Sequence, residues 1–191
     1  MNPNHELLLL VAFLPDFTQP YIGISYKVEG TELIQVITSE NQHLYGKQLE
    51  QMFRMRHEYY VLGHGWEGLK SENGQETDEF DNLDAVYLVG VDIQGDVAAS
   101  LRLNPSTGPT LLKKFKDYAD SPLPMSEACW DLSRWIARPD QRRASHTRWP
   151  TNHQRELALG VLEFCQSKGV DCLTMLCETR LAERIKAYGW P

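Results

Sequence analysis

Hydrophobic residues recur along the chain at two spacings, and the change from one spacing to the other predicts helices and strands. Over residues 41–60, apolar side chains lie three or four positions apart, as on one face of a helix. Residues 85–92 and 97–103 are rich in apolar and β-prone types, and the short polar stretch between them contains Gly95. These two runs predict an antiparallel hairpin.

The second half of the chain continues the alternation and sets the fold class. Residues 110–118 predict a short amphipathic helix and residues 129–137 a strand. A helix over 152–168 is expected to end at Gly169, followed by a buried strand over 170–177 and a last helix over 180–188. Strands linked first by a hairpin and later through helices indicate an α/β domain with a mixed, twisted sheet flanked by helices.

The polar segment 63–82 is expected to be a long loop, and its second half is strongly acidic. Glu76, Asp78, Glu79 and Asp81 place four carboxylates within six positions. Such a density raises carboxyl pKa values unless cations lie nearby. A solvated acidic loop and a loop neutralised by cations both fit; the spacing lacks the glycine and terminal glutamate of a calcium-binding EF-hand.

Two arginines lie within apolar runs that predict strands. Arg102 and Arg134 need carboxylate partners there, because burying an unpaired guanidinium is costly. Asp78, Asp81 and Asp131 are the expected partners, and bidentate pairing would order the acidic loop against the sheet. Ion pairs that merely fix the loop are an equally simple interpretation.

Trp66 and a basic segment are further candidates for binding. Trp66 is either a buried anchor or an aromatic face for a cationic ligand. Arg138, Arg142, Arg143 and Arg148 stand out in an acidic chain and suit either an anionic partner or an ordinary solvated loop.

Composition limits the remaining functional classes. The formal net charge of −7 over 191 residues argues against bulk nucleic-acid binding. The four cysteines lack metal-site spacing, so no metal is expected. The apolar run 7–14 is too short to cross a membrane, and a cytoplasmic protein is expected. No GxSxG or Walker-type loop is present.

Eight separated positions together resemble the acyl-homoserine-lactone synthases, the LuxI-type autoinducer synthases. They are Arg56, Tyr60, Trp66, Asp78, Asp81, Arg102, Asp131 and Arg134. The order and intervals match over roughly residues 36–190. Two positions depart from the family's pattern: Tyr60 stands where the family usually has Phe, and Asp131 where it usually has Glu.

The resemblance implies a fold like that of the GNAT acyltransferases, and two substrates. These are S-adenosylmethionine and an acyl thioester of acyl carrier protein or coenzyme A, with no separate cofactor. Arg56, Tyr60 and Trp66 would lie on the adenosylmethionine side, and Asp78, Asp81, Arg102 and Arg134 would form an ion-pair cluster that organises the site. The product would be an acyl-homoserine lactone, a quorum-sensing signal.

The implied chemistry needs a base, because an ammonium group has no lone pair with which to attack a thioester. Glu76, with its longer side chain, and Asp131 are the candidates, and Arg134 completes the predicted catalytic set. Ser133 and Thr174 fall where the resemblance places residues near the third carbon of the acyl chain, so a 3-oxo-acyl product is favoured. An ordinary β-branched strand residue at Thr174 is an equally simple interpretation.

The resemblance also divides the chain and suggests a partner. Residues 34–191 would form the synthase domain, shortened at the C-terminus relative to its relatives, and residues 1–33 an extension of unknown role. Arg138, Arg142, Arg143 and Arg148 would attract an acidic acyl carrier protein. A general N-acyltransferase of the same fold and a non-catalytic adenosylmethionine-binding relative are the alternative functions.

Overall fold

Six strands form one mixed sheet in the computed structural model, which describes residues 7–14, 34–66, 68–119, 122–138, 152–179 and 181–183. The strand order is β1-β8-β7-β6-β5-β2. The bounds are Leu7–Phe13 (β1), Ile34–Ile37 (β2), Val86–Val91 (β5), Val97–Pro105 (β6), Cys129–Ala137 (β7) and Cys172–Glu178 (β8). Neighbours are antiparallel except β7 and β8, which are parallel. The predicted mixed sheet is confirmed.

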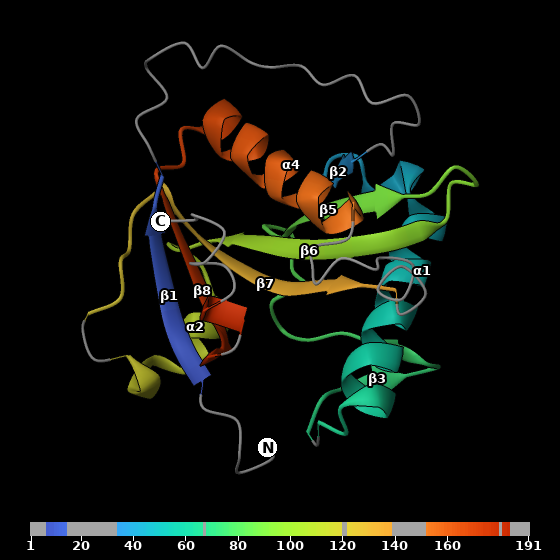
Figure 1. Cartoon of the computed structure of the whole chain (residues 1–191), viewed down its shortest axis with the longest axis horizontal. Helices are drawn as coiled ribbons and strands as arrows, with labels where there is room; N and C mark the ends of the chain where they lie inside the picture. The colour runs from blue at the N-terminus through green and yellow to red at the C-terminus, as the bar shows by residue number, and fades with distance from the viewer. Residues whose placement is uncertain are drawn as a thin grey trace.

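Helices cover both faces of this sheet (Figure 1). On one face, α1 (Gly46–Arg56) follows a short 3-10 turn, η1 (Gln42–Leu44), and continues into a π-helical turn, η2 (His57–Gly63). On the other face, α4 (Asn152–Lys168) crosses β5 and β6. The short α2 (Leu111–Lys114) and η3 (Lys116–Tyr118) connect β6 to β7.

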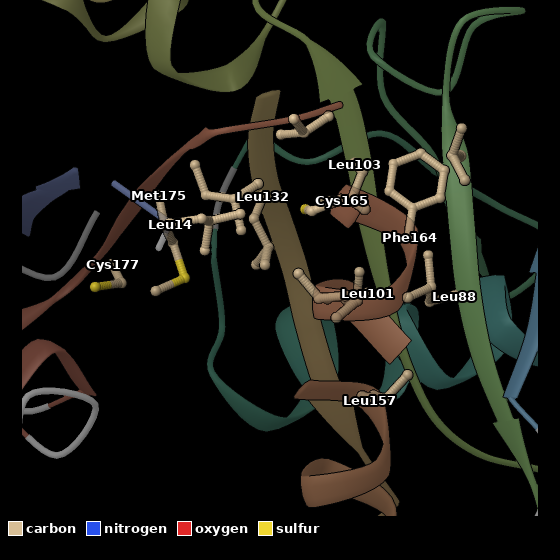
Figure 2. Packing of buried hydrophobic residues seen from close by; sticks show 14 of the residues in the cluster. Leu14, Leu88, Leu101, Leu103, Leu132, Leu157, Phe164, Cys165, Met175 and Cys177 are labelled. Carbon is tan, nitrogen blue, oxygen red and sulfur yellow. The ribbon is translucent and has the colours of Figure 1, made fainter. Parts of the chain in front are cut away.

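The alternation of side chains along the strands divides the core between these two helical layers. Leu88 and Leu101 belong to one cluster with Leu157 and Phe164 of α4, and Leu132 joins the same cluster beside Leu14 (Figure 2). The intervening strand residues face α1 and contribute to a second cluster with Met52 and Met55. The strands are therefore buried on both sides, which explains their nearly continuous apolar sequence.

The segment 63–82, which its sequence predicts to be a long loop, contains a small hairpin. It consists of β3 (Ser71–Glu72) and β4 (Gln75–Glu76). Its turn is Asn73-Gly74, whose φ angles are 53° and 73°. Two left-handed residues make the type I′ turn that suits a two-residue hairpin, and Asn-Gly is its preferred sequence. The hairpin fixes the position of Glu76.

Two irregularities in β7 shape the middle of the sheet. Pairing of β7 with β6 shifts register between Ser100 and Arg102, and Arg134 has a φ of 55°. Pairing of β7 with β8 covers only Cys129–Asp131 against Cys172–Thr174. Beyond that point the two strands diverge from a shared corner (Figure 1).

The described part of the N-terminal region belongs to the same sheet. β1 pairs with β8 along the whole strand, from Leu7 opposite Glu178 to Phe13 opposite Cys172. Leu14 packs into the core near Met175 and Cys177. No helix within the described residues is long and apolar enough to span a membrane. Helical residues follow β8 at 179 and 181–183; the rest of the predicted last helix lies outside the described residues.

Candidate active site

Three arginines and three carboxylates meet on the α1 face of the sheet and form a buried ion-pair cluster. Arg56, at the end of α1, donates from Nε to Oε2 of Glu76 at 2.5 Å. Its two terminal nitrogens donate to the two carboxylate oxygens of Asp81, at 2.8 and 2.9 Å. Arg56 is only 1% exposed and Glu76 is fully buried. These charges are therefore paired almost entirely with each other.

The other two arginines come from neighbouring strands. Arg102 on β6 donates to Asp78 at 2.5 and 3.1 Å and to Asp81 at 2.8 Å. Arg134 on β7 donates to Glu76 at 2.7 and 3.2 Å and to Asp78 at 2.9 Å. Every carboxylate of the cluster thus contacts two arginines. Arg56, Arg102 and Arg134 are therefore the cations that neutralise the acidic loop.

The backbone at Arg134 explains how this side chain reaches the cluster. Ser133 already faces the cluster, because its hydroxyl accepts a hydrogen bond from Nε of Arg102 at 3.1 Å. Strict alternation would therefore turn Arg134 toward α4. The register shift and the left-handed φ of 55° place two successive residues of β7 on the same face. A non-glycine residue in this conformation costs about 1–3 kcal/mol, which the ion pairs must offset.

The cluster keeps its carboxyl groups ionised. Burial alone would raise the pKa of Glu76, but hydrogen bonds from Arg134 and the charge of Arg56 hold that pKa below its usual range. Burial likewise opposes ionisation of Asp81, and Arg56 and Arg102 lower its pKa strongly. A carboxylate held in this way is a weak proton acceptor. The geometry therefore favours Glu76 as a positioning group.

The structure corrects the expected partner of the strand arginines. Glu76 makes the ion pair that was predicted for Asp131. Asp131 instead accepts a hydrogen bond from the hydroxyl of Thr174 at 3.0 Å and a longer one from the backbone N–H of Leu112 at 3.4 Å. Asp131 lies two residues before Ser133 on β7, in the part of the strand that still pairs with β8. Burial raises the pKa of Asp131 to about 6, although its hydrogen bond with Thr174 opposes the shift.

A cavity of about 400 Å³ opens where β7 and β8 diverge, and we call it the β7–β8 cavity. One end is aromatic: the rings of Tyr60 and Trp66 lie 4.9 Å apart, and the guanidinium carbon of Arg134 lies 5.0 Å from the centre of the Tyr60 ring. The other end is lined by Met175, Leu176 and other apolar groups of β8 and the residues after it. The aromatic end is thus supplied by η2 and the residues after it, and the apolar end by β8, with Gln154 and Glu178 as further polar lining residues.

The predicted site residues divide into those that line this cavity and those behind it. Tyr60, Trp66, Ser133 and Arg134 line it. Behind its wall lie the remaining members of the cluster and the Asp131–Thr174 pair, namely Arg56, Glu76, Asp78, Asp81, Arg102, Asp131 and Thr174. Thr174 was predicted to bind a 3-oxo group, and here its hydroxyl is bonded to Asp131.

The opposite side of the cluster borders a second cavity of about 480 Å³. Asp78, Asp81, Phe53 and Tyr87 are among its lining residues, with hydroxyl and amide side chains at its rim. It too has a pair of aromatic rings, since Phe53 and Tyr87 pack edge to face with their centres 6.0 Å apart. The predicted substrate-binding residues Tyr60, Trp66 and Ser133 line the β7–β8 cavity, whereas Asp78 and Asp81 line the second cavity.

The predicted carrier-protein site is only partly described. Arg138 forms an ion pair with Asp92 at 2.9 Å, which links the end of β7 to the turn after β5. Arg142, Arg143 and Arg148 lie outside the described residues. Their role in binding a carrier protein stays a prediction.

Two residues that are not among those predicted for the site also lie in it. Tyr87 on β5 donates its hydroxyl hydrogen to Asp81 at 3.0 Å. His64, immediately after η2, lines the β7–β8 cavity beside Trp66. Neither had a sequence signal beyond its residue type: a tyrosine in a strand and a histidine between two glycines are common in structural roles.

Comparison of the chain with known proteins gives one family. The sequence model for the family described as autoinducer synthase matches residues 40–191. An isovaleryl-homoserine lactone synthase of Bradyrhizobium diazoefficiens is 30% identical over 160 residues, which cover 83% of this chain and 69% of that protein. An acyl-homoserine-lactone synthase of Ralstonia nicotianae is 32% identical over 136 residues, 68% of this chain and 66% of that protein.

Solved structures give the same result for the fold. The CoA-dependent acyl-homoserine lactone synthase BjaI, with SAM and isopentyl-CoA, superposes with a TM-score of 0.74 at 30% identity, covering 83% of this chain and 72% of that one. The CoA-dependent synthase MesI superposes with a TM-score of 0.67 at 30% identity, covering 82% and 76%.

Proposed function

The chain belongs to the autoinducer synthase family, whose members are acyltransferases that make acyl-homoserine lactones, and we propose that its β7–β8 cavity carries out this reaction. The cavity would bind S-adenosylmethionine at its aromatic end and an acyl thioester at its apolar end. Acyl transfer to the methionyl amine, followed by ring closure, would release a thiol, methylthioadenosine and the lactone.

The observation that carries the proposal is that different elements supply the aromatic and the apolar side chains of the β7–β8 cavity. S-adenosylmethionine presents a sulfonium cation, and an aromatic face attracts an onium group. Trp66 and Tyr60 supply that face at one end. A fatty acyl chain needs an apolar wall, which β8 supplies at the other end with Met175 and Leu176. The reacting amine and thioester would meet between them, beside Ser133 and Arg134.

Arg134 is suited to orient the methionyl group. Its Nε and Nη2 atoms are committed to Glu76 and Asp78, whereas none of these bonds uses Nη1. Because Arg134 lines the cavity, Nη1 is available to donate to the methionyl carboxylate. The cluster behind it would hold the guanidinium in one orientation, which is the role that we propose for Glu76 and Asp78.

The thioester carbonyl would bind along β7. Ladder pairing with β8 ends at Asp131, so the edge of β7 near Ser133 faces the cavity without a neighbouring strand. Backbone amides at such an edge can donate hydrogen bonds to the oxyanion that forms when the amine attacks. After the thiol leaves, the methionyl carboxylate would attack the carbon attached to the sulfonium, and methylthioadenosine would depart as a neutral thioether. The ring closure needs orientation more than acid or base catalysis.

Coenzyme A is the acyl carrier that we propose. BjaI and MesI, each 30% identical to this chain, are both described as CoA-dependent. Arg138, one of the four arginines expected to contact a carrier protein, is bonded to Asp92 instead of standing free at the surface. An acyl carrier protein is the alternative donor, and assays with both donors distinguish them.

Mass spectrometry of extracts from bacteria that express the chain tests the proposed function. A homoserine-lactone fragment, absent from cells with the empty vector, is the expected result, and the parent mass identifies the acyl group. A soluble, folded protein that yields no lactone in these extracts would contradict the proposal.

A further inference from the structure

His64 occupies a tight turn at the aromatic end of the β7–β8 cavity. Glycines lie on both sides of it. A Cβ atom at Gly63 would lie 3.0 Å from the backbone oxygen of Glu58, and Gly65 has a φ of 60°. The turn closes with a hydrogen bond from the backbone N–H of Trp66 to the carbonyl of Tyr60 at 3.0 Å. The turn around His64 therefore needs glycine at both neighbouring positions.

The imidazole ring is also held in one orientation and one tautomer. Its Nδ1 atom lies 2.7 Å from the backbone oxygen of Tyr59. A carbonyl oxygen can only accept, so Nδ1 must carry the hydrogen and Nε2 of the neutral ring has a lone pair. The ring packs on that of Tyr59 at 4.3 Å. Within the described residues, Nε2 has no hydrogen-bond partner.

The position of His64 suits it to act on the methionyl amine. The centres of the His64 and Trp66 rings lie 6.3 Å apart, and both residues line the cavity. A sulfonium seated on Trp66 places its amine at the end of a short methylene arm, within reach of a neighbouring side chain. His64 lies at the exposed rim, so a proton accepted there can pass to water.

Several other titratable groups of the site are less suited to take up a proton. The remaining titratable residues on the cavity wall are Tyr59, Tyr60, Arg134, Cys177 and Glu178. Burial raises the pKa of Tyr60 to about 12, so it stays a neutral phenol. Glu76 is bound by two arginines, and Asp131 lies behind the wall. Histidine is the side chain that ordinarily changes charge near neutral pH.

We propose that His64 is the general base of the synthase, an inference that rests on the proposed function. Nε2 would take one proton from the ammonium group of S-adenosylmethionine, and the freed nitrogen lone pair would form the bond to the thioester carbon. As the carbon–sulfur bond of the thioester breaks, the second proton of that nitrogen would go to the departing thiolate. The proton on His64 would then pass to solvent, which balances the release of one proton per lactone formed.

The test compares His64→Asn with His43→Asn in the purified enzyme. Asparagine keeps a donor for the Tyr59 carbonyl but has no basic nitrogen, and His43 is an exposed histidine on η1 that does not line the cavity. At neutral pH, His64→Asn should lower kcat about 100-fold or more while changing the KM for S-adenosylmethionine less than about threefold. The defect should shrink as pH rises, because the substrate amine then loses its proton unaided. His43→Asn should match wild type.

Chemical rescue separates a base from a structural role. Added imidazole should restore part of the activity of His64→Ala and should not affect Arg134→Ala. A kcat within twofold of wild type, an equal loss at every pH, or no rescue by imidazole would overturn the assignment of His64. A wild-type enzyme that makes no lactone would instead refute the proposed function, and the base with it.

Discussion

Arg134 reaches Glu76 from a left-handed backbone position: its Nη2 atom lies 2.7 Å from Oε1 of Glu76, while its own φ is 55°. The two residues are 58 positions apart, on β7 and β4. The bulge in β7 positions Arg134 and the Asn73-Gly74 hairpin positions Glu76, so both contribute to the same ion pair. Their coincidence at one ion pair supports the role proposed for the Arg134 guanidinium in orienting the substrate.

Substitution of Arg134 by alanine should abolish lactone synthesis and destabilise the fold. It would leave Glu76 and Asp78 with one arginine fewer in a buried site, a change that typically costs about 3–5 kcal/mol. Urea denaturation measures the free energy of unfolding. Arg54→Ala is the matched control, because Arg54 pairs with Glu50 on the exposed side of α1 and should change stability by less than about 1 kcal/mol. Equal effects of the two substitutions would refute the role of the cluster.

Substitution of Trp66 by alanine should weaken binding of S-adenosylmethionine more than binding of S-adenosylhomocysteine. The second ligand is a neutral thioether, so only the first gains from attraction between a cation and the aromatic face, which is worth about 1–2 kcal/mol when desolvated. Isothermal titration calorimetry gives both affinities. The ratio of the two dissociation constants should change about 5- to 30-fold. An equal loss for both ligands would indicate that Trp66 only shapes the cavity.

Asp131 should make stability fall as pH rises from about 4 to 6. Its pKa is about 6 in the folded protein and about 3.9 in an unfolded chain. Between these values the folded state binds the extra proton, so raising the pH removes that advantage. The loss is about 3 kcal/mol, from two pKa units at 1.36 kcal/mol each. Asp131→Asn should lack this contribution, whereas Asp84→Asn, at an exposed site, should keep it. Chemical denaturation at about pH 4.5 and pH 7 measures the difference; parallel behaviour of wild type and Asp131→Asn would contradict it.

Removal of the Tyr87 hydroxyl should weaken the cluster without dismantling it. Tyr87→Phe would take one donor from Asp81, which would keep its bonds to Arg56 and Arg102. The expected cost is about 1–2 kcal/mol in unfolding free energy, with lactone synthesis reduced and still measurable. Thermal unfolding and a lactone assay test this. A loss of activity as complete as that of Arg134→Ala would show that Tyr87 has a direct part in the reaction.

The sequence was most informative where local pattern and tertiary structure agree. The helix 152–168 and the strand 129–137 were predicted at their observed bounds, because apolar spacing and Gly169 defined the helix and a β-prone run defined the strand. The Asn73-Gly74 pair is typical of a two-residue hairpin turn, but the polar and acidic residues around it favoured the prediction of a loop.

The site was less predictable because it depends on departures from regular geometry. Strict alternation along β7 gives no reason for Arg134 to face Glu76, since the bulge that turns it there has no marker in the sequence. Asp131 was predicted to pair with a strand arginine. In the structure Glu76 pairs with Arg134, and Asp131 is bonded to Thr174. His64 gained significance only when the divergence of β7 and β8 placed a cavity beside it.

The most direct test of the account is the stoichiometry of the purified enzyme supplied with S-adenosylmethionine and an acyl-coenzyme A. Free thiol, methylthioadenosine and acyl-homoserine lactone are measured in the same reaction. If the β7–β8 cavity binds both substrates, each turnover should release one molecule of each of these three products. Thiol release without methylthioadenosine would identify a general N-acyltransferase or a thioesterase, and adenosylmethionine binding with no product would identify a binding protein; either result would contradict the proposed synthase.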